Sequence, residues 1–463
     1  MKTGHKVWTA LGALAVLAAS GAGRARDRDP DDVAARAQER IDRATRHATE
    51  RDGQRGSERA AEAGDRAQER EGHNGGEVRE VESRGREAGS ETESGTETET
   101  RSAEIEIESA ASSRALADIA QIEDADHDDR GFPVRRGELV AMDLPEAALA
   151  SASVKGFRVI EQHRLAAAGH ELVRLATPRG MKPLAARAVL RALAPGAEID
   201  LVHYYGLSLT AGEKPHRLKQ PPAAAPRLPS GTMTVGMIDT AVAAHPALGA
   251  ARVMPWADGA QTGAPVGHGT AVASLIAAEG RATIYAANIF RGPAARPFTS
   301  ADIIAEALGW MLEQRVPIIN MSLAGPRNAI LDRLVRDALG RGQTVVAAAG
   351  NGGPSAPPAW PAAVPGVVAV TAVDKDLRIY RYANRGRYIS VAARGVDVVA
   401  AQAPAGFARF TGTSFATPHV AGWLGRCRAE GGAAEACIDR LRKSARDLGA
   451  AGYDDVYGFG FVD

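Results

Sequence analysis

Residues 412–422 of this 463-residue chain read GTSFATPHVAG, and residues 267–274 read GHGTAVAS. The first stretch contains Ser414 and the second His268, each close behind a glycine and ahead of a helical pattern. A serine hydroxyl is a good nucleophile only beside a base, and histidine, with a pKa near ~6.5, is the suitable base. A buried carboxylate would orient the imidazole, and Asp239 directly follows an apolar run at 234–238. These three residue types predict nucleophilic catalysis if the fold brings them together.

Each of these residues also has a simpler explanation when it is taken alone. Asp239 fits a turn at a strand end, while His268 and Ser414 fit capping positions at helix starts. Asn351, in AAGNGG at 348–353, fits a turn, but its side-chain N–H could also stabilise an oxyanion. Catalysis is favoured because all four residues follow predicted strand ends or begin predicted helices in one region of the chain.

Strand-length apolar runs alternate with helical patterns from residue 232 onward. The runs lie at 234–238, 283–289, 317–321, 344–349 and 367–373, and the helical stretches at 269–278, 300–314 and 328–340. Near-continuous apolar strands separated by helices are typical of a parallel sheet covered on both faces. We therefore predict an α/β domain over 232–463 whose active site lies at the carboxyl ends of its strands.

A smaller unit precedes this domain. Residues 132–205 show strand patterns at 138–144, 157–165, 170–176 and 198–205, and helical patterns at 145–152 and 182–193. The order β-α-β-β-α-β predicts a ferredoxin-like α+β domain. Residues 206–231 contain five prolines and are predicted to be a linker.

The first 131 residues have a different composition. Residues 1–25 combine a basic start, a 14-residue apolar run at 7–20 and small residues, which indicates a cleaved export signal. Residues 24–100 hold 21 acidic and 15 basic side chains with no aromatic residue and no leucine. Such a segment cannot bury enough apolar surface to fold, so we expect 26–131 to be a disordered charged linker.

Composition excludes several classes of partner. Lys+Arg and Asp+Glu number 56 each, which removes any global case for nucleic acid or an anionic membrane as partner. No apolar run approaches the ~20 residues of a spanning helix, so no stable membrane insertion is expected. We expect no cofactor and predict no metal site, because no compact calcium-loop signature is present; a scattered structural calcium site is not readable from sequence.

The two cysteines lie ten residues apart around a Gly-Gly pair. In a chain predicted to be exported, to the periplasm or the outside of the cell, Cys427 and Cys437 are expected to form a disulfide across a helix hairpin. Two buried free thiols are the alternative.

Residues 232–463 resemble the subtilisin family of serine proteases (subtilases) in the GTSFATPHVAG and HGTAVAS motifs, and also in NMSLAG at 320–325. The resemblance implies a secreted endopeptidase with an Asp239–His268–Ser414 triad, an oxyanion donor at Asn351, and protein or peptide substrates. It further implies substrate contacts at Ser322, Leu323, Ala324, Gly325, Ala349 and Gly350. The 132–205 unit resembles the inhibitory propeptide of that family in pattern and position, which implies an autoprocessed zymogen bound by its own propeptide in cis; an ordinary accessory domain is the alternative. Because the last predicted strand gives way to the linker there, the first cleavage is expected between Tyr204 and Leu207.

Two other functions remain open at this point. A catalytically weak or dead subtilase fold would act as a binding protein, although all four key residue types are present. Alternatively, the charged N-terminal segment carries the function and the protease domain only processes it.

Overall fold

The computed structural model describes residues 125–207, 216–218, 231–249, 251–256, 266–292 and 297–463. The predicted signal at 1–25, most of the predicted linker at 26–131 and most of 206–231 lie outside these residues. We call residues 125–206 the small domain and residues 231–463 the large domain. Within the described part of the chain, no helix has both the length and the apolar character needed to cross a membrane.

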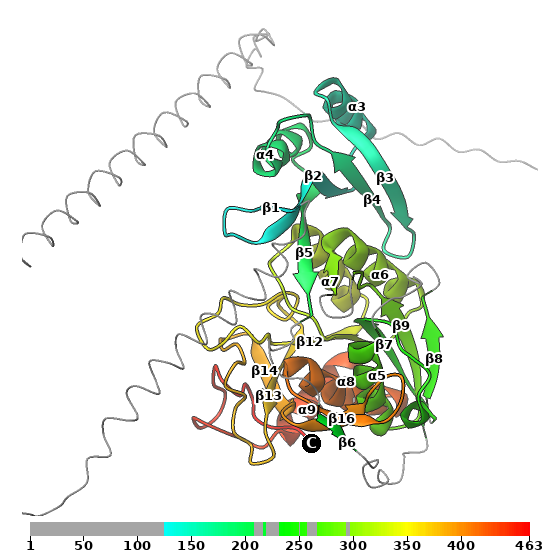
Figure 1. Ribbon diagram of the computed structural model, residues 1–463, viewed down its shortest axis with the longest axis vertical. Coiled ribbons are helices and arrows are strands. Elements are labelled where there is room, and N and C mark those ends of the chain that lie inside the picture. The colour runs from blue at the N-terminus through cyan, green and yellow to red at the C-terminus, as the bar shows by residue number, and fades with distance from the viewer. Residues whose placement is uncertain (1–124, 208–215, 219–230, 250, 257–265, 293–296) are drawn as a thin grey trace, which may run out of the picture. The chain divides into compact units, whose positions relative to one another are not determined.

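A parallel sheet forms the centre of the large domain, as predicted (Figure 1). Its strand order is β14-β13-β12-β11-β7-β9-β8, and all neighbouring strands are parallel. The strands are β7 (Met233–Asp239), β8 (Ala251–Pro255), β9 (Ala282–Asn288), β11 (Ile318–Met321), β12 (Thr344–Ala348), β13 (Val368–Val373) and β14 (Ile389–Arg394). The two outer strands β8 and β14 were not predicted, because their apolar runs are short and mixed with polar residues.

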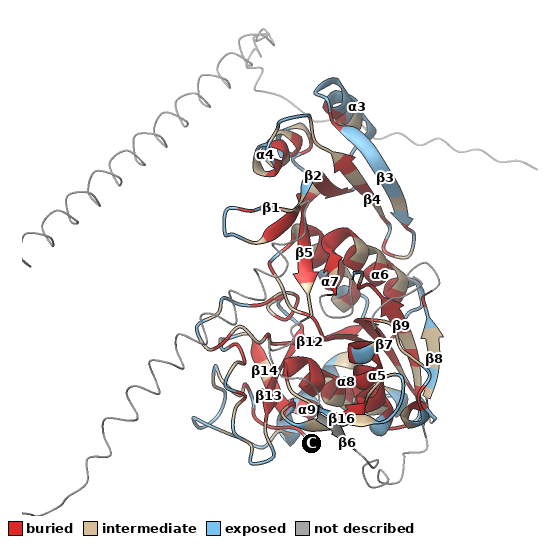
Figure 2. Cartoon of the chain, in the orientation of Figure 1, coloured by how far each residue is buried: buried red, intermediate tan, exposed pale blue. Residues whose placement is uncertain are grey.

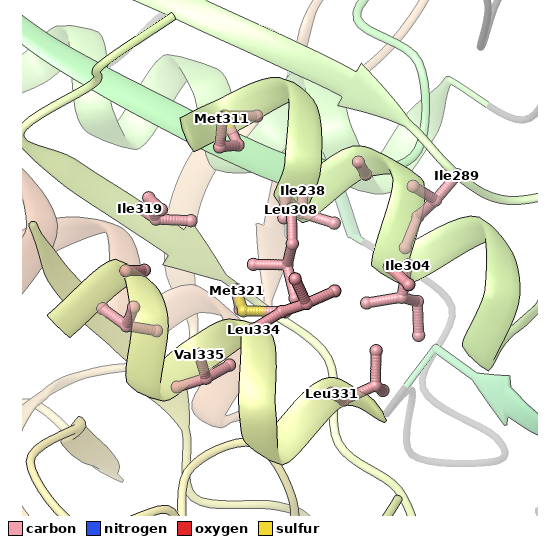
Figure 3. Packing of buried hydrophobic residues seen from close by; sticks show 14 of the residues in the cluster. Ile238, Ile289, Ile304, Leu308, Met311, Ile319, Met321, Leu331, Leu334 and Val335 are labelled. Atoms are coloured by element: carbon pink, nitrogen blue, oxygen red, sulfur yellow. The ribbon is translucent and has the colours of Figure 1, made fainter. Parts of the chain in front are cut away.

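Helices cover both faces of this sheet. Helices α6 (Ala301–Glu313) and α7 (Ala329–Gly340) pack on one face, and α5 (Gly267–Ala278) and α8 (Thr413–Ala429) on the other. Figure 3 shows how Leu308 and Leu334 from α6 and α7 meet Ile319 and Met321 of β11. The strands alternate their side chains between the two cores, so the inner strands β7, β11, β12 and β13 are almost entirely buried, whereas the edge strand β8 has no buried residue (Figure 2).

The shorter elements complete the large domain. A 3₁₀ turn (Pro246–Leu248) follows β7, and strands β15 (Val398–Ala401) and β16 (Phe407–Phe410) form a three-stranded sheet with β6 (His216–Leu218), which precedes the large domain in the chain. Helix α9 (Ala434–Ser444) packs beside α8. The disulfide between Cys427 of α8 and Cys437 of α9 is present, with 5.8 Å between the Cα atoms, which confirms the predicted pairing.

The small domain has the predicted ferredoxin-like order. Its elements are β2 (Pro133–Met142), α3 (Glu146–Val154), β3 (Arg158–Leu165), β4 (His170–Ala176), α4 (Pro183–Leu193) and β5 (Glu198–Gly206). The strands pair antiparallel in the order β5-β2-β4-β3. Helices α3 and α4 cover one face, and the other face joins the core formed by α6 and α7 of the large domain.

Order begins earlier than the predicted start at Phe132. A short strand β1 (Ala125–His127) pairs with β2, although its residues belong to the range expected to be linker. The carboxylate of Asp128 accepts the N–H groups of Arg130 and Phe132, which closes a turn between the two strands. Burial disfavours the charged form of Asp128, but these bonds and His203 outweigh it and lower the pKa of Asp128 to about 2. On sequence alone, these residues fall in the predicted linker because the segment before Phe132 is acidic. The partner that binds Asp128, His203, lies 75 residues away and could not be recognised locally.

Candidate active site

Asp239 and His268 meet at the carboxyl end of the central sheet. Asp239 is the last residue of β7, and His268 lies in the first turn of α5. The Nδ1 atom of His268 lies 2.7 Å from Oδ1 of Asp239, and both residues are buried. The backbone N–H of Thr240 donates to the same Oδ1 at 2.6 Å. A carboxylate held in this way fixes which imidazole nitrogen carries the proton and leaves Nε2 as the basic atom.

Gly269 allows the start of α5 to lie close to the end of β7. A Cβ atom at position 269 would lie 2.3 Å from the carbonyl oxygen of Thr240, inside contact distance of the backbone. The N–H of Gly269 also donates to Oγ1 of Thr240 at 2.7 Å. The start of α5 therefore lies directly against the end of β7, which brings His268 within hydrogen-bond distance of Asp239.

Ser414 occupies the second position of α8 and is fully buried. Pro418 lies four residues further along this helix and has no N–H to give to the Ser414 carbonyl. The hydroxyl of Ser322 fills that role, since its Oγ donates to the Ser414 carbonyl oxygen at 2.9 Å. Asn320 in turn donates to Oγ of Ser322 at 3.0 Å. A side chain from the end of β11 thus fixes the backbone of Ser414.

The hydroxyl of Ser414 is not bonded to His268 in this structure. Its Oγ donates to the carbonyl oxygen of Ser322 at 3.1 Å, and Nε2 of His268 is buried without a hydrogen-bond partner among the described residues. The imidazole packs against the ring of Phe415, the residue after Ser414, with 5.0 Å between centroids. The contact between Asp239 and His268 is formed, whereas the contact between His268 and Ser414 is not. A rotation about the Cα–Cβ bond of Ser414 would turn its hydroxyl away from the Ser322 carbonyl. Catalytic hydrogen bonds are often completed only when substrate binds.

Asn351 lies beside the start of α8. Its Oδ1 accepts both the N–H of Thr413, at 3.0 Å, and the hydroxyl of Thr413, at 2.9 Å. Because the oxygen of the carboxamide is fixed by the residue before Ser414, its NH₂ group is held at the same helix N-terminus. The backbone N–H groups of a first helical turn have no partner within the helix, so this position suits a developing negative charge. Thr413 was not singled out in the sequence, although it lies inside the motif.

Of the predicted substrate contacts, Gly325 is covered by the small domain. A Cβ atom at Gly325 would lie 2.2 Å from the Tyr205 ring, and the Tyr205 hydroxyl donates to the Pro326 carbonyl at 2.9 Å. Of the preceding residues, Ser322 is hydrogen-bonded to Ser414, and Leu323 and Ala324 lie between Ser322 and Gly325 in the chain. Gly325 also exchanges backbone hydrogen bonds with Trp360 at 3.0 Å in both directions.

Ala349 and Gly350 lie on the other predicted substrate segment, between β12 and Asn351. The Ala349 carbonyl accepts the Tyr388 hydroxyl at 2.8 Å, and the Gly350 carbonyl accepts the N–H of Asn384 at 3.1 Å. Burial raises the pKa of the Tyr388 hydroxyl to about 12, so it remains a donor. Both backbone carbonyls are therefore bonded within the protein. No local pattern in the sequence pointed to Tyr388 or Asn384 as supports.

His419, further along α8, has a structural environment. Its Nδ1 lies 3.0 Å from Oε1 of Glu279, and Arg426 contacts the other oxygen of this carboxylate. Burial of Glu279 opposes ionisation, but His419 and Arg426 outweigh it and lower the pKa of this carboxyl. Among the described residues, no group of three or more His, Cys, Asp and Glu side chains has a metal-binding arrangement.

Comparisons with known proteins identify the family of the large domain. The sequence profile of the subtilase family matches residues 230–460. Subtilisin BL from Lederbergia lenta is 32% identical over 261 residues, which cover 53% of this chain and 94% of that protein. The minor extracellular protease Epr from Bacillus subtilis strain 168 is 31% identical over 42% of this chain and 32% of its own length.

A solved structure extends the likeness in fold. The crystal structure of fervidolysin from Fervidobacterium pennivorans, a keratinolytic enzyme related to subtilisin, superposes with a TM-score of 0.59. The superposition covers 73% of this chain and 61% of that one at 20% sequence identity. At this identity the likeness concerns the fold alone.

Proposed function

The chain belongs to the subtilase family, and from that premise we propose that it is a serine endopeptidase made as an autoprocessed zymogen, with Ser414 as nucleophile. Serine-type endopeptidase activity follows from the family; the residue roles and the maturation scheme are our proposals. The observation that carries the residue roles is the 2.7 Å contact between His268 and Asp239, formed beside the buried Ser414.

The proposed reaction uses these groups in sequence. Nε2 of His268 takes the proton of Ser414 as Oγ attacks the peptide carbonyl, and Asp239 stabilises the imidazolium that forms. The oxyanion accepts hydrogen bonds from the Asn351 side chain and from the backbone N–H of Ser414. His268 then protonates the leaving amine, and water hydrolyses the acyl-enzyme by the same route.

Labelling with a fluorophosphonate probe tests the nucleophile directly. The probe should modify Ser414 in the purified protein, and Ser414→Ala or His268→Ala should lower kcat by about 10⁶ while leaving a folded protein. Retention of more than a few per cent of the activity by either variant would refute the assignment. A folded wild-type chain that neither reacts with the probe nor cleaves any peptide would instead support the alternative, a subtilase fold that acts as a binding protein.

The small domain is proposed to be the propeptide, occupying 132–205 together with β1. Strand β5 pairs antiparallel with β10 (Phe298–Ser300) of the large domain, so its backbone extends the edge of the enzyme as a substrate strand would. Tyr205 at the end of β5 covers Gly325, one of the predicted substrate contacts. Both observations support inhibition in cis before maturation.

The processed bond is proposed to lie beyond Leu207, rather than between Tyr204 and Leu207 as the strand pattern alone suggested. Tyr205 is anchored at Gly325, whereas the residue that contacts Ser414 is Ser322, three positions earlier. At about 3.3 Å per extended residue, about three further residues are needed to reach the nucleophile. N-terminal sequencing of the active protein checks this, and a mature chain that still begins near Arg26 would refute autoprocessing.

Export is the last part of the proposal. It is supported by the signal-like residues 1–25, by the disulfide and by a relative named as an extracellular protease. Fractionation of expressing cells should find the mature protein outside the cytoplasm, and a protein that stays cytoplasmic with an intact N-terminus would contradict export.

A further inference from the structure

An arginine-rich loop follows β13 and lies against the segment that carries Asn351. We call residues 378–387 the basic loop; it contains four arginines and no acidic residue. All four arginine side chains are exposed, and only Arg378 forms an ion pair with a described residue, Asp376. Arg387 lies near Tyr453, as do the acidic residues Asp454 and Asp455, so its charge is partly compensated. Arg381 and Arg385 are therefore the least compensated of the four arginines.

The basic loop is fixed to the Asn351 segment by several hydrogen bonds. Asn384 accepts the N–H of Gly352 at 2.7 Å on its Oδ1 and donates to the Pro357 carbonyl at 3.1 Å. The N–H of Gly353 donates to the carbonyl of Tyr382 at 2.8 Å. The position of the arginines is therefore tied to that of the oxyanion donor.

Sheet order decides which part of a substrate would meet this loop. The segments that follow β11, β12 and β13 lie side by side along the carboxyl edge, since these strands are neighbours in that order. The chain of the small domain approaches from the β11 side, where Tyr205 covers Gly325. A peptide whose carbonyl lies at Asn351, after β12, then continues towards the β13 side. The part of the peptide beyond the cleaved bond therefore faces the basic loop.

Arg381 and Tyr382 provide a suitable contact for such a peptide. The guanidinium carbon of Arg381 lies 4.5 Å from the centre of the Tyr382 ring, which is only partly buried. This stacking holds the guanidinium plane in place, and a guanidinium can bind a carboxylate with two parallel hydrogen bonds. Gly353, which binds Tyr382, is two residues from Asn351, a span of at most about 7 Å. That span corresponds to about two residues of an extended substrate, and the length of the Arg381 side chain extends the reach to a third.

We propose that the basic loop is a specificity site that selects Asp or Glu at the second or third residue after the cleaved bond. Arg381 binds the carboxylate and Arg385 adds long-range attraction. This inference rests on the proposed endopeptidase function and names the class of substrate that it prefers: polypeptides acidic on the leaving-group side.

Cleavage of a peptide library tests the proposal with the mature wild-type enzyme. In a mixture of peptides prepared from a cell proteome, mass spectrometry identifies both sides of every cut, whatever the enzyme prefers on the acyl side. Acidic residues should be enriched at the second or third position after the cut. Paired fluorogenic peptides that differ only in Asp or Lys at that position should then differ about two- to fivefold in kcat/KM at low salt, as expected for one partly exposed ion pair.

Variants separate the loop from the rest of the enzyme. Arg381→Gln should remove most of the Asp-over-Lys preference and leave kcat/KM for an Ala peptide within about twofold, and Arg381→Glu should invert the preference. Arg440→Gln is the matched control, because Arg440 is also exposed and stacked, on Trp423 of α8, but belongs to α9. It should change nothing. The wild-type preference should also shrink in 1 M salt.

The outcomes distinguish this inference from the proposed function. Active enzyme with no charge preference after the cut, or with the same preference in Arg381→Gln, overturns the specificity site and leaves the endopeptidase intact. Absence of both peptide cleavage and fluorophosphonate labelling overturns the endopeptidase itself.

Discussion

Ser322 supports the catalytic serine by compensating for a proline. Pro418 leaves the carbonyl of Ser414 without its helical partner, and the Ser322 hydroxyl donates to it at 2.9 Å in a fully buried environment. Ser322 also accepts the Ser414 hydroxyl on its carbonyl oxygen. A residue expected only to contact substrate thus also positions the nucleophile.

Ser322→Ala should leave the buried Ser414 carbonyl without a donor. We expect a loss of about 1–3 kcal/mol in the free energy of unfolding, measured by urea titration in a Ser414→Ala background to prevent self-digestion. In the active protein kcat should fall about tenfold or more with a smaller change in KM. Ser322→Thr keeps the hydroxyl and should restore part of both losses; if Ser322→Ala equals wild type in both measurements, the positioning role is wrong.

Asn351 offers a sharper test, because the oxygen and the nitrogen of its side-chain amide have different roles. Asn351→Ala should lower kcat by about 10²–10³ with little change in KM, since the donor is needed chiefly in the transition state. Asn351→Asp retains an acceptor for Thr413 but loses the NH₂ group, so it should be similarly impaired. An effect confined to KM would mean that Asn351 acts in substrate binding or in the turn.

At the scale of elements, α8 carries both Ser414 at its start and the disulfide near its end. Cys427 and Cys437 join α8 to α9, and both sulfurs are buried in the core beneath the sheet. The crosslink closes a short loop, which should stabilise the native state by roughly 2–3 kcal/mol through the unfolded state.

The double variant Cys427→Ala/Cys437→Ala should therefore unfold at a lower urea concentration than its Ser414→Ala parent. Reductant should produce a similar shift in the parent and none in the double variant. Thiol labelling of unfolded, unreduced protein should detect no free cysteine, and labelling of two thiols would mean that the purified protein lacks the bond.

At the scale of the whole molecule, an ion network joins the two domains. Arg135 of β2 donates to Asp302, in the first turn of α6, at 2.9 Å and to Ser300 of β10 at 2.8 Å. Burial disfavours the charged guanidinium, but Asp302 and Glu138 outweigh it and raise the pKa of Arg135 above its usual range. Arg174 approaches the same Asp302 carboxylate at 3.5 Å, and both arginines also pair with Glu138 of the small domain.

Arg135→Ala should loosen the small domain, because it removes the shorter of the two ion pairs that join the buried Asp302 to the small domain. In a Ser414→Ala chain, hydrogen exchange of β5 and β10 should accelerate at least tenfold. Arg136→Ala, which removes a neighbouring exposed arginine on β2, is the control and should have little effect. In the wild-type background the same change should shorten the lag before activity appears; unchanged exchange would show that the apolar contacts alone hold the domains together.

The sequence by itself determined the fold class, the order of elements in the small domain from β2 onward, the inner strands of the large-domain sheet and the four candidate catalytic residues. These depend on local patterns: apolar runs of strand length, helical periodicity and short motifs at strand ends. The disulfide could also be expected, because both cysteines lie close together in the chain.

Only the tertiary structure decided the remaining features. Strand β1 depends on the distant His203, the support of Ser414 by Ser322 spans 92 residues, and the basic loop meets Asn351 only because β12 and β13 are neighbours. Contacts between residues so far apart leave no periodic trace in the sequence, since they arise from how the strands are ordered in the sheet.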